Sequence, residues 1–213
     1  MKYDSVIFDL DGTLLNTLDD LCDSVNFTLR KHNMPERTLS EVRSFVGDGI
    51  RNLVCRSAVP NTSEEQIDRM LATFKEHYKD HNSDKTKPYE GIIELLSELK
   101  KNGIPTAVVS NKVDIAVKML VSGYFGSLVD IAIGELEGVK RKPSPDTVFL
   151  AMEKLSSKNP VYIGDSQVDV QTAKNAGIDG IFVTWGFRDE SVLKQAGGEH
   201  IVHSVKELWE VLF

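Results

Sequence analysis

Two acidic residues end the first apolar segment of the chain, in the stretch VIFDLDGT. Asp9 closes the apolar run and Asp11 follows two positions later, so in extended backbone their side chains can face the same side. Asp9 could attack phosphorus as a nucleophile. Asp11 could protonate the leaving oxygen and then activate water. Gly12 and Thr13 are candidate substrate-binding residues, because a glycine lets the backbone pass close to a phosphate group.

Further candidates follow later apolar segments: Ser110, Asn111 and Lys112 in VVSNK, Lys142 in KRKPSPD, and Asp165 and Asp169 in GDSQVD. Ligands of open α/β sheets bind beyond the carboxyl ends of the strands, so these side chains would share one crevice with Asp9. Ser110 and Lys142 could stabilise phosphoryl oxygens, while Asn111 and Lys112 are candidate substrate contacts. Several carboxylates in one crevice require a cation, and oxygen ligands favour Mg²⁺.

The elements that would position these residues alternate between two patterns. Short apolar runs, which indicate buried parallel strands, cover residues 5–9, 106–111, 130–134, 160–165, 180–185 and, more weakly, 200–204. Between most of them lie amphipathic helical patterns, such as the stripe of Ile92, Leu95, Leu96 and Leu99. This alternation predicts an α/β fold with a doubly wound parallel sheet.

Residues 16–87 show helical stripes and no convincing strand. We therefore expect an inserted all-helical domain of four helices at 16–87, within an α/β core of residues 1–15 and 88–213. The last of these helices carries the stripe of Ile67, Leu71, Phe74 and Tyr78 and should begin after an N-cap at Thr62 or Ser63. The acidic run TLDDLCD is interpreted as the polar face of the first helix.

The amino-acid composition argues against several classes of function. The formal net charge of -7 argues against wrapping nucleic acid, and no apolar stretch reaches the length of a membrane span. Cys22 and Cys55 are expected to be reduced thiols, which favours a cytoplasmic location. The five histidines show no spacing typical of a metal site, so we assign them no chemistry. Trp185 is interpreted as a packing residue. The oligomeric state is left open.

Four of these segments, taken together, resemble the motifs of the haloacid dehalogenase superfamily of phosphatases: DLDGT, VVSN, the lysine of KPSPD, and GDSQVD. The resemblance implies a Rossmann-like core with a helical cap, in which Asp9 is the nucleophile and Asp11 the general acid and base. It also implies Mg²⁺ held by the Asp9 side chain, the Asp11 backbone carbonyl and Asp165, with Asp169 assisting at the metal site. The dehalogenase branch lacks the second motif acid, so Asp11 places the chain with the phosphatases.

Three local segments, VGDGIRNLV, SNK and VTWGF, are similar to the phosphoglycolate phosphatase and pyrophosphatase group. This likeness implies that Gly47 and Gly49 form a cap loop that faces the active site, and that Arg51 or Lys112 reaches a substrate carboxylate or second phosphate. The favoured function is Mg²⁺-dependent hydrolysis of a small phosphorylated metabolite through an aspartyl-phosphate, with phosphoglycolate as favoured substrate. The alternatives are an inorganic pyrophosphatase, a sugar-phosphate mutase resembling β-phosphoglucomutase and, more distantly, a non-catalytic phospho-accepting module.

Overall fold

The computed structural model describes residues 2–213, which form two compact units. The larger unit comprises residues 2–15 and 88–213, and the smaller unit is Asn16–Lys87. Where the chain passes between them, β2 (Leu15–Asn16) and β3 (Lys87–Pro88) form a two-stranded sheet. Within the described part, no helix combines the length and the apolar character needed to cross a membrane.

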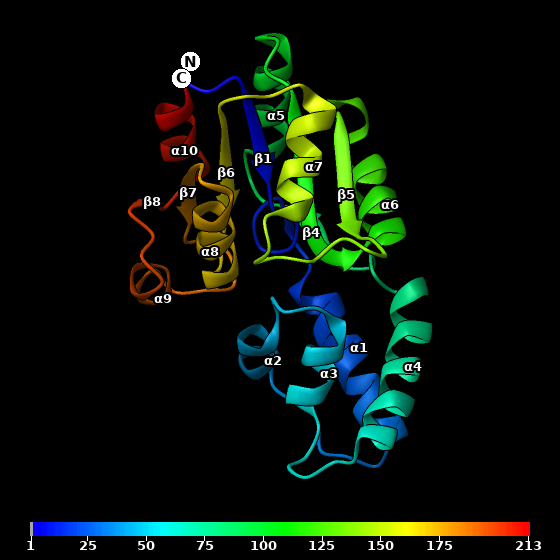
Figure 1. Cartoon of the computed structure of the whole chain (residues 1–213). Helices are drawn as coiled ribbons and strands as arrows, with labels where there is room; N and C mark the ends of the chain where they lie inside the picture. The colour runs from blue at the N-terminus through cyan, green and yellow to red at the C-terminus, as the bar shows by residue number, and fades with distance from the viewer. Residues whose placement is uncertain (1) are drawn as a thin grey trace. The chain divides into compact units, whose positions relative to one another are not determined.

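The larger unit contains a six-stranded parallel sheet with the order β5-β4-β1-β6-β7-β8 (Figure 1). Its strands are β1 (Ser5–Phe8), β4 (Thr106–Val113), β5 (Ile131–Glu135), β6 (Pro160–Gly164), β7 (Asp179–Val183) and β8 (His200–Val202). All six predicted strands are therefore confirmed, including the weak one. The chain builds outward from β1 on both sides, which confirms the doubly wound α/β fold.

Alternate residues of the strands point to opposite faces of the sheet and meet different helices. Val6 and Phe8 of β1 pack with α5 (Ile92–Lys101), α6 (Asp114–Phe125) and α10 (Val205–Leu212). Ile7 of β1 and Tyr162 of β6 pack with α7 (Asp146–Leu155), α8 (Gln167–Ala176) and α9 (Glu190–Gln195). A short 3₁₀ helix, Gly126–Leu128, follows α6. The larger unit is thus a sheet between two helical layers.

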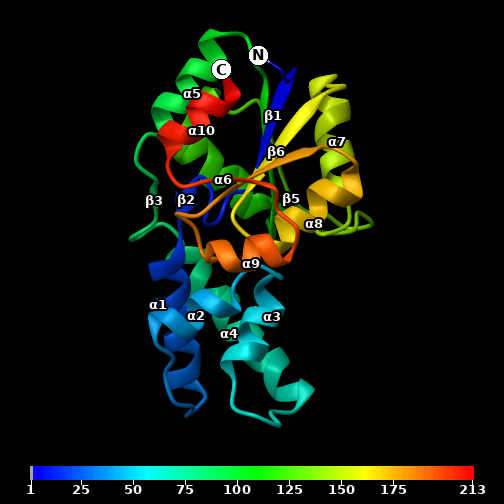
Figure 2. The same ribbon diagram turned by 90° about the vertical axis from the view of Figure 1, so that its left-hand side faces the viewer.

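The α5 helix shows how the sequence pattern determines burial. Ile92, Leu95, Leu96 and Leu99 are all fully buried, as the i, i+3, i+4, i+7 stripe predicts. Gly103, just beyond the end of the helix, has φ +70°, a conformation that a glycine adopts without steric cost. Figure 2 shows α10 beside α5 on this face, where the two helices are in contact.

The smaller unit consists of the four predicted helices: α1 (Leu18–Lys31), α2 (Leu39–Phe45), α3 (Ile50–Ser57) and α4 (Glu64–Asp80). Ser63 caps α4, since its hydroxyl accepts a hydrogen bond from the backbone N–H of Gln66. The buried stripe of α4 includes Met70 instead of the predicted Leu71, which is half-buried. Ile67, Phe74 and Tyr78 are buried as predicted, so the stripe differs from the prediction at this one position.

Asp20 contradicts the interpretation of TLDDLCD as a polar face. Its side chain is buried, and its carboxylate accepts hydrogen bonds from the backbone N–H groups of Lys85 and Thr86 and from the Thr86 hydroxyl. These bonds compensate the cost of burying a charge and fasten the last residues of the unit to its first helix.

Candidate active site

The candidate site lies where β1, β4 and β6 end side by side, with β1 in the middle. In the register of the sheet, Phe8 pairs with Val108 of β4 and with Ile163 of β6. The Asp9 backbone N–H donates to the carbonyl oxygen of Ile163 at 2.8 Å, so regular pairing continues into the acid itself. From β1 the chain adds β4 and β5 on one side of the sheet and then β6, β7 and β8 on the other. Ligand sites of such sheets lie where the connections reverse in this way, and Asp9 is at that point.

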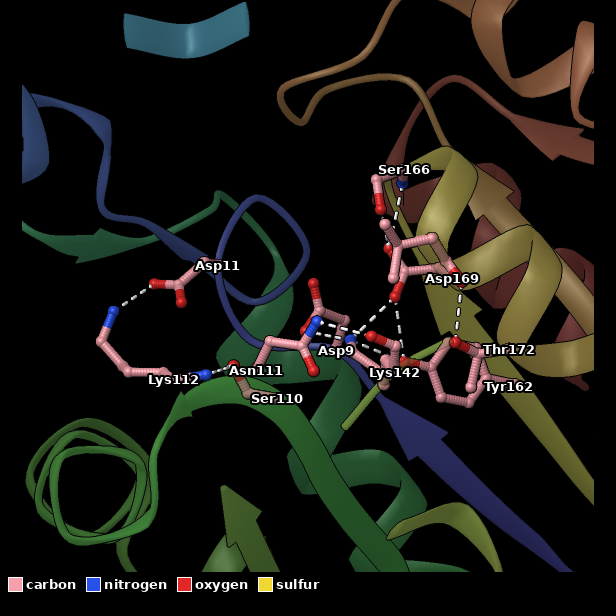
Figure 3. A network of polar contacts seen from close by, with 11 residues as sticks. Asp9, Asp11, Ser110, Asn111, Lys112, Lys142, Tyr162, Ser166, Asp169 and Thr172 are labelled. Carbon is pink, nitrogen blue, oxygen red and sulfur yellow. Dashed lines mark hydrogen bonds and ion pairs between the residues drawn. The ribbon is translucent and has the colours of Figure 1, made fainter. Parts of the chain in front are cut away.

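Lys142 joins three groups of this site. Its ammonium donates to Asp9 Oδ1 at 2.7 Å, to Asp169 Oδ1 at 2.8 Å and to the Tyr162 hydroxyl at 2.9 Å (Figure 3). The side chain is buried, and these three partners match the three donors of an ammonium group. The Asn111 side chain donates to the backbone carbonyl of Lys142 at 3.0 Å. The contacts therefore hold both ends of the lysine in place.

Asp169 lies in the first turn of α8 and is fully buried. Oδ1 accepts from Lys142 and from the Tyr162 hydroxyl, while Oδ2 accepts from the Ser166 backbone N–H at 3.0 Å and from the Ser166 hydroxyl at 2.6 Å. Each carboxylate oxygen thus already has two protein donors. This arrangement suits a residue that orients Lys142 better than one that binds a metal ion directly.

The Asp165 carboxylate packs closely against the backbone of two glycines, Gly12 and Gly186. Its Oδ2 accepts a 2.6 Å hydrogen bond from the Phe187 backbone N–H. A Cβ atom added to Gly12 or to Gly186 would overlap the Asp165 carboxylate, and Gly12 also has φ +89°. Glycine is thus required at Gly12 for both space and conformation. Gly186 belongs to the VTWGF segment, but its contact with Asp165 was not predicted from the sequence.

The electrostatics of the cluster indicate a cation site. Carboxylate oxygens of Asp9, Asp165 and Asp169 lie within 4.8 Å of one another, and all three residues are buried. Burial raises the pKa of Asp9 to about 7; the Asp169 carboxylate adds to this rise and the Lys142 ammonium opposes it. Burial, together with the charges of Asp169 and Asp9, raises the pKa of Asp165 well above its usual range.

Lys142 supplies the positive charge that contacts Asp9 and Asp169 directly, and the charge of Arg188 opposes the rise in the pKa of Asp165. Burial alone would lower the pKa of Lys142, but the charges of Asp169 and Asp9 raise it well above its ordinary value, so the ammonium stays protonated. One ammonium does not balance three carboxylates. An all-oxygen donor set with surplus negative charge fits Mg²⁺, with Asp9 and Asp165 as the residues best placed to hold it.

Asp11 and Lys112 form a second ion pair at the same edge of the sheet. The Lys112 ammonium lies 2.7 Å from Asp11 Oδ1, and Figure 3 shows the two side chains pointing toward each other. The Ser110 hydroxyl accepts a hydrogen bond from the Lys112 backbone N–H at 3.2 Å. The structure therefore brings Ser110, Asn111 and Lys112 together with the two motif acids, as their positions in the sequence predicted.

Thr13 offers a free donor beside this pair. Its buried hydroxyl has no hydrogen-bond partner among residues 2–213, and such a group is costly unless a ligand satisfies it. Its backbone carbonyl accepts a hydrogen bond from the Trp185 indole N–H at 3.1 Å. Trp185 packs against the core, as expected, but its contact with the motif loop was not predicted.

The other two predicted substrate residues belong to the helical unit. Gly47 lies between α2 and α3 with φ +123°. Arg51 lies in α3, where its guanidinium pairs with Glu64 at 2.5 Å and with Asp68, both on α4. The predicted contact of Arg51 with a substrate anion stays a prediction, and such an anion would compete with these two carboxylates.

Comparison with known proteins agrees with this geometry. Residues 6–183 match the family model of haloacid dehalogenase-like hydrolases. The chain is 34% identical over 201 residues to a phosphoglycolate phosphatase from Mesorhizobium japonicum, covering 90% of this chain and 87% of that protein. It is 29% identical over 215 residues to a protein from Caldanaerobacter subterraneus provisionally named a pyrophosphatase, covering 100% and 94%.

A solved structure shows the same fold over the whole chain. The crystal structure of a protein from Lactobacillus delbrueckii, provisionally named a phosphoglycolate phosphatase, has a TM-score of 0.94 and 34% identity, and the match covers 100% of this chain and 99% of that one. Sequence motifs, fold and relatives agree: the chain belongs to the haloacid dehalogenase-like hydrolase family.

Proposed function

We propose that this chain is a Mg²⁺-dependent phosphatase that hydrolyses a small phosphate monoester through an aspartyl-phosphate on Asp9, with phosphoglycolate as favoured substrate. The observation that carries this proposal is the buried carboxylate cluster. Oxygens of Asp9 and Asp165 lie close enough together to bind one metal ion, and Lys142 forms ion pairs with both Asp9 and Asp169. Mg²⁺ bound there would neutralise the surplus charge and attract phosphate oxygens.

In the first half-reaction, an Asp9 oxygen attacks phosphorus, an O–P bond forms, and the bond from phosphorus to the substrate oxygen breaks. Asp11 donates a proton to that leaving oxygen. Lys142 keeps Asp9 in position through Oδ1, and the hydroxyls of Ser110 and Thr13 are available to phosphoryl oxygens.

In the second half-reaction, Asp11 removes a proton from water. That water attacks phosphorus, the bond between phosphorus and Asp9 breaks, and inorganic phosphate leaves with the Asp9 carboxylate restored. Neither half-reaction needs a further co-reactant.

The preference for phosphoglycolate rests on the named relative from Mesorhizobium japonicum and on cations suited to a substrate carboxylate. Lys112 on β4 and Arg51 on α3 are the residues we propose for that carboxylate, with Gly47 shaping the loop before Arg51. Pyrophosphate is the second candidate, supported by the relative that matches all of this chain, because a second phosphate could use the same cations.

Two simpler observations support the proposed location of the protein and the proposed class of its partner. Both cysteines are free thiols, Cys22 buried and Cys55 exposed, which supports the proposed cytoplasmic location. The net charge of -7 supports a small phosphorylated molecule as partner in preference to nucleic acid.

The decisive experiment measures phosphate release from phosphoglycolate, pyrophosphate, hexose phosphates and nucleoside monophosphates, with Mg²⁺ or with a chelator. Asp9→Asn should abolish release, whereas Asp80→Asn, which changes an exposed acid of α4, should not. In acid-quenched wild-type protein, the peptide containing Asp9 should carry a phosphoryl group that hydroxylamine removes. Wild-type turnover in Asp9→Asn would overturn the mechanism, and a preference for pyrophosphate would change only the substrate.

A further inference from the structure

A separate pocket of about 730 Å³ lies in the larger unit. Tyr89, Trp185 and Trp209 supply its aromatic walls, and all three are half-buried. It is bordered by α5 and α10, the neighbouring helices that are in contact in Figure 2. None of the residues of the carboxylate cluster lines it. Its volume is in the range of pockets that hold small organic molecules, and such pockets are mostly apolar with a few polar groups.

The polar groups of this pocket are mainly acidic. Glu90, Glu94 and Glu210 line it with exposed side chains, and Lys206 is the single lysine or arginine among its lining residues. His203 also lines it, but its ring lies 3.2 Å from both Glu190 and Glu207, so these two acids compensate any charge on that ring. The pocket therefore has a surplus of negative charge beside aromatic rings.

We infer that this pocket binds a small organic cation, an ammonium group carried on an apolar body. The faces of tryptophan and tyrosine rings attract cations, and carboxylates add charge attraction at the rim. The Tyr89 and Trp185 rings lie 6.5 Å apart at their centroids and are tilted by 59°, so they form two inclined walls. An anion or a neutral molecule of the same shape would lack these attractions.

Two hydrogen bonds connect residues of the pocket to the loop that follows Asp9. No residue of the pocket belongs to the carboxylate cluster of Asp9, Asp165 and Asp169. The Trp185 indole N–H donates to the Thr13 carbonyl, and the Tyr89 backbone N–H donates to the Leu14 carbonyl at 3.1 Å. A ligand in the pocket would contact Trp185 and Tyr89 directly and leave the carboxylate cluster open. Binding should therefore be independent of phosphate and of Asp9.

The test uses intrinsic fluorescence, because the chain has two tryptophans and both line this pocket. Phenethylammonium should produce a saturable change in tryptophan emission, with matching heat in calorimetry. Phenethyl alcohol, its neutral counterpart, should bind about fivefold more weakly or worse, and phenylacetate more weakly still. Asp9→Asn and saturating inorganic phosphate should leave the affinity for the cation unchanged.

The charge requirement is tested by Glu90→Gln/Glu94→Gln, which should weaken phenethylammonium binding by about fivefold or more. Glu153→Gln, which neutralises an exposed acid on α7, is the matched control and should not. Thermal unfolding would verify that each variant is folded. The inference is overturned if neither fluorescence nor calorimetry detects saturable binding, if the alcohol binds as well as the cation, or if the double variant binds as the wild type does.

Discussion

The Lys112 ammonium lies 2.7 Å from Asp11 Oδ1, although 101 positions separate the two residues. The Lys112 side chain is 4% exposed and that of Asp11 is 17% exposed, so solvent screens this ion pair far less than a surface pair. The pair connects β4 to the loop after β1. Lys112 therefore contacts Asp11, the proposed general acid and base, in addition to its proposed contact with the substrate.

Lys112→Met should lower kcat by about tenfold or more with a smaller change in KM, because Asp11 would lose the partner that orients it. Steady-state kinetics with the preferred substrate measures both constants. Lys118→Met is the matched control, since it breaks a Lys–Asp pair on α6 whose lysine is 59% exposed, and it should leave both constants near wild type. A rise in KM with unchanged kcat would assign Lys112 to substrate binding alone.

Asp169→Asn should lower kcat by about a hundredfold and destabilise the fold by ~1–3 kcal/mol. An asparagine can present only one oxygen, so either Lys142 and Tyr162 or the two Ser166 donors would lose their acceptor. Kinetics and denaturant unfolding measure the two effects. Tyr162→Phe, which removes the hydroxyl contacts with Lys142 and Asp169 but leaves the bond between Lys142 and Asp169, should cost less in both. A fully active Asp169→Asn variant would contradict the proposed positioning of Lys142.

Gly164→Ala should destabilise the protein and reduce activity, because the added Cβ would overlap the side chain of Asp169. Gly123→Ala is the matched control: Gly123 lies in α6, and a Cβ there meets open space. In a helix interior this change should stabilise by ~0.5–1 kcal/mol without affecting turnover. Equal free energies of unfolding for the two variants would contradict the close packing around Asp169.

The sequence determined the fold so well because each buried strand is a continuous apolar run that ends in a polar residue. Asp9 and Asp165 could be placed at one edge because neighbouring parallel strands end together. The motif also indicates Lys142, but its neighbours Lys140 and Arg141 carry the same charge, and the contact that fixes its position is not visible in the sequence. Lys142 reaches Asp9 because Asn111 of β4 holds its backbone carbonyl, and this contact depends on tertiary structure.

Other contacts had no local signal. Asp19 and Asp20 are adjacent acids in one helix, yet Asp20 alone is buried, because its partners lie 65 and 66 positions away. Gly186 is required by the carboxylate of Asp165, but a glycine in a loop usually signals only a turn. In both cases the determining neighbour is remote in the sequence, so periodicity and turn chemistry do not reveal it.

Without Mg²⁺, the protein should lose stability as the pH rises from about 4 to 7. The pKa of Asp9 rises from its ordinary value of 3.8 to about 7 in the folded protein. Between these values the folded state keeps a proton that the unfolded state has released, so the free energy of unfolding falls with pH, by up to ~4 kcal/mol for this group. The raised pKa of Asp165 acts in the same direction.

Mg²⁺ should reverse this loss, since it favours the ionised carboxylates, and its stabilising effect should be larger at pH 8 than at pH 5. Denaturant unfolding across this pH range, with Mg²⁺ or with a chelator, measures both effects. Asp9→Asn removes the titrating group and keeps its shape, so its metal-free stability should depend less on pH than that of the wild type. Equal pH dependence of the two metal-free proteins would contradict the raised pKa of Asp9, and equal stabilisation of the wild type by Mg²⁺ at pH 5 and pH 8 would show that the cation does not act on this cluster.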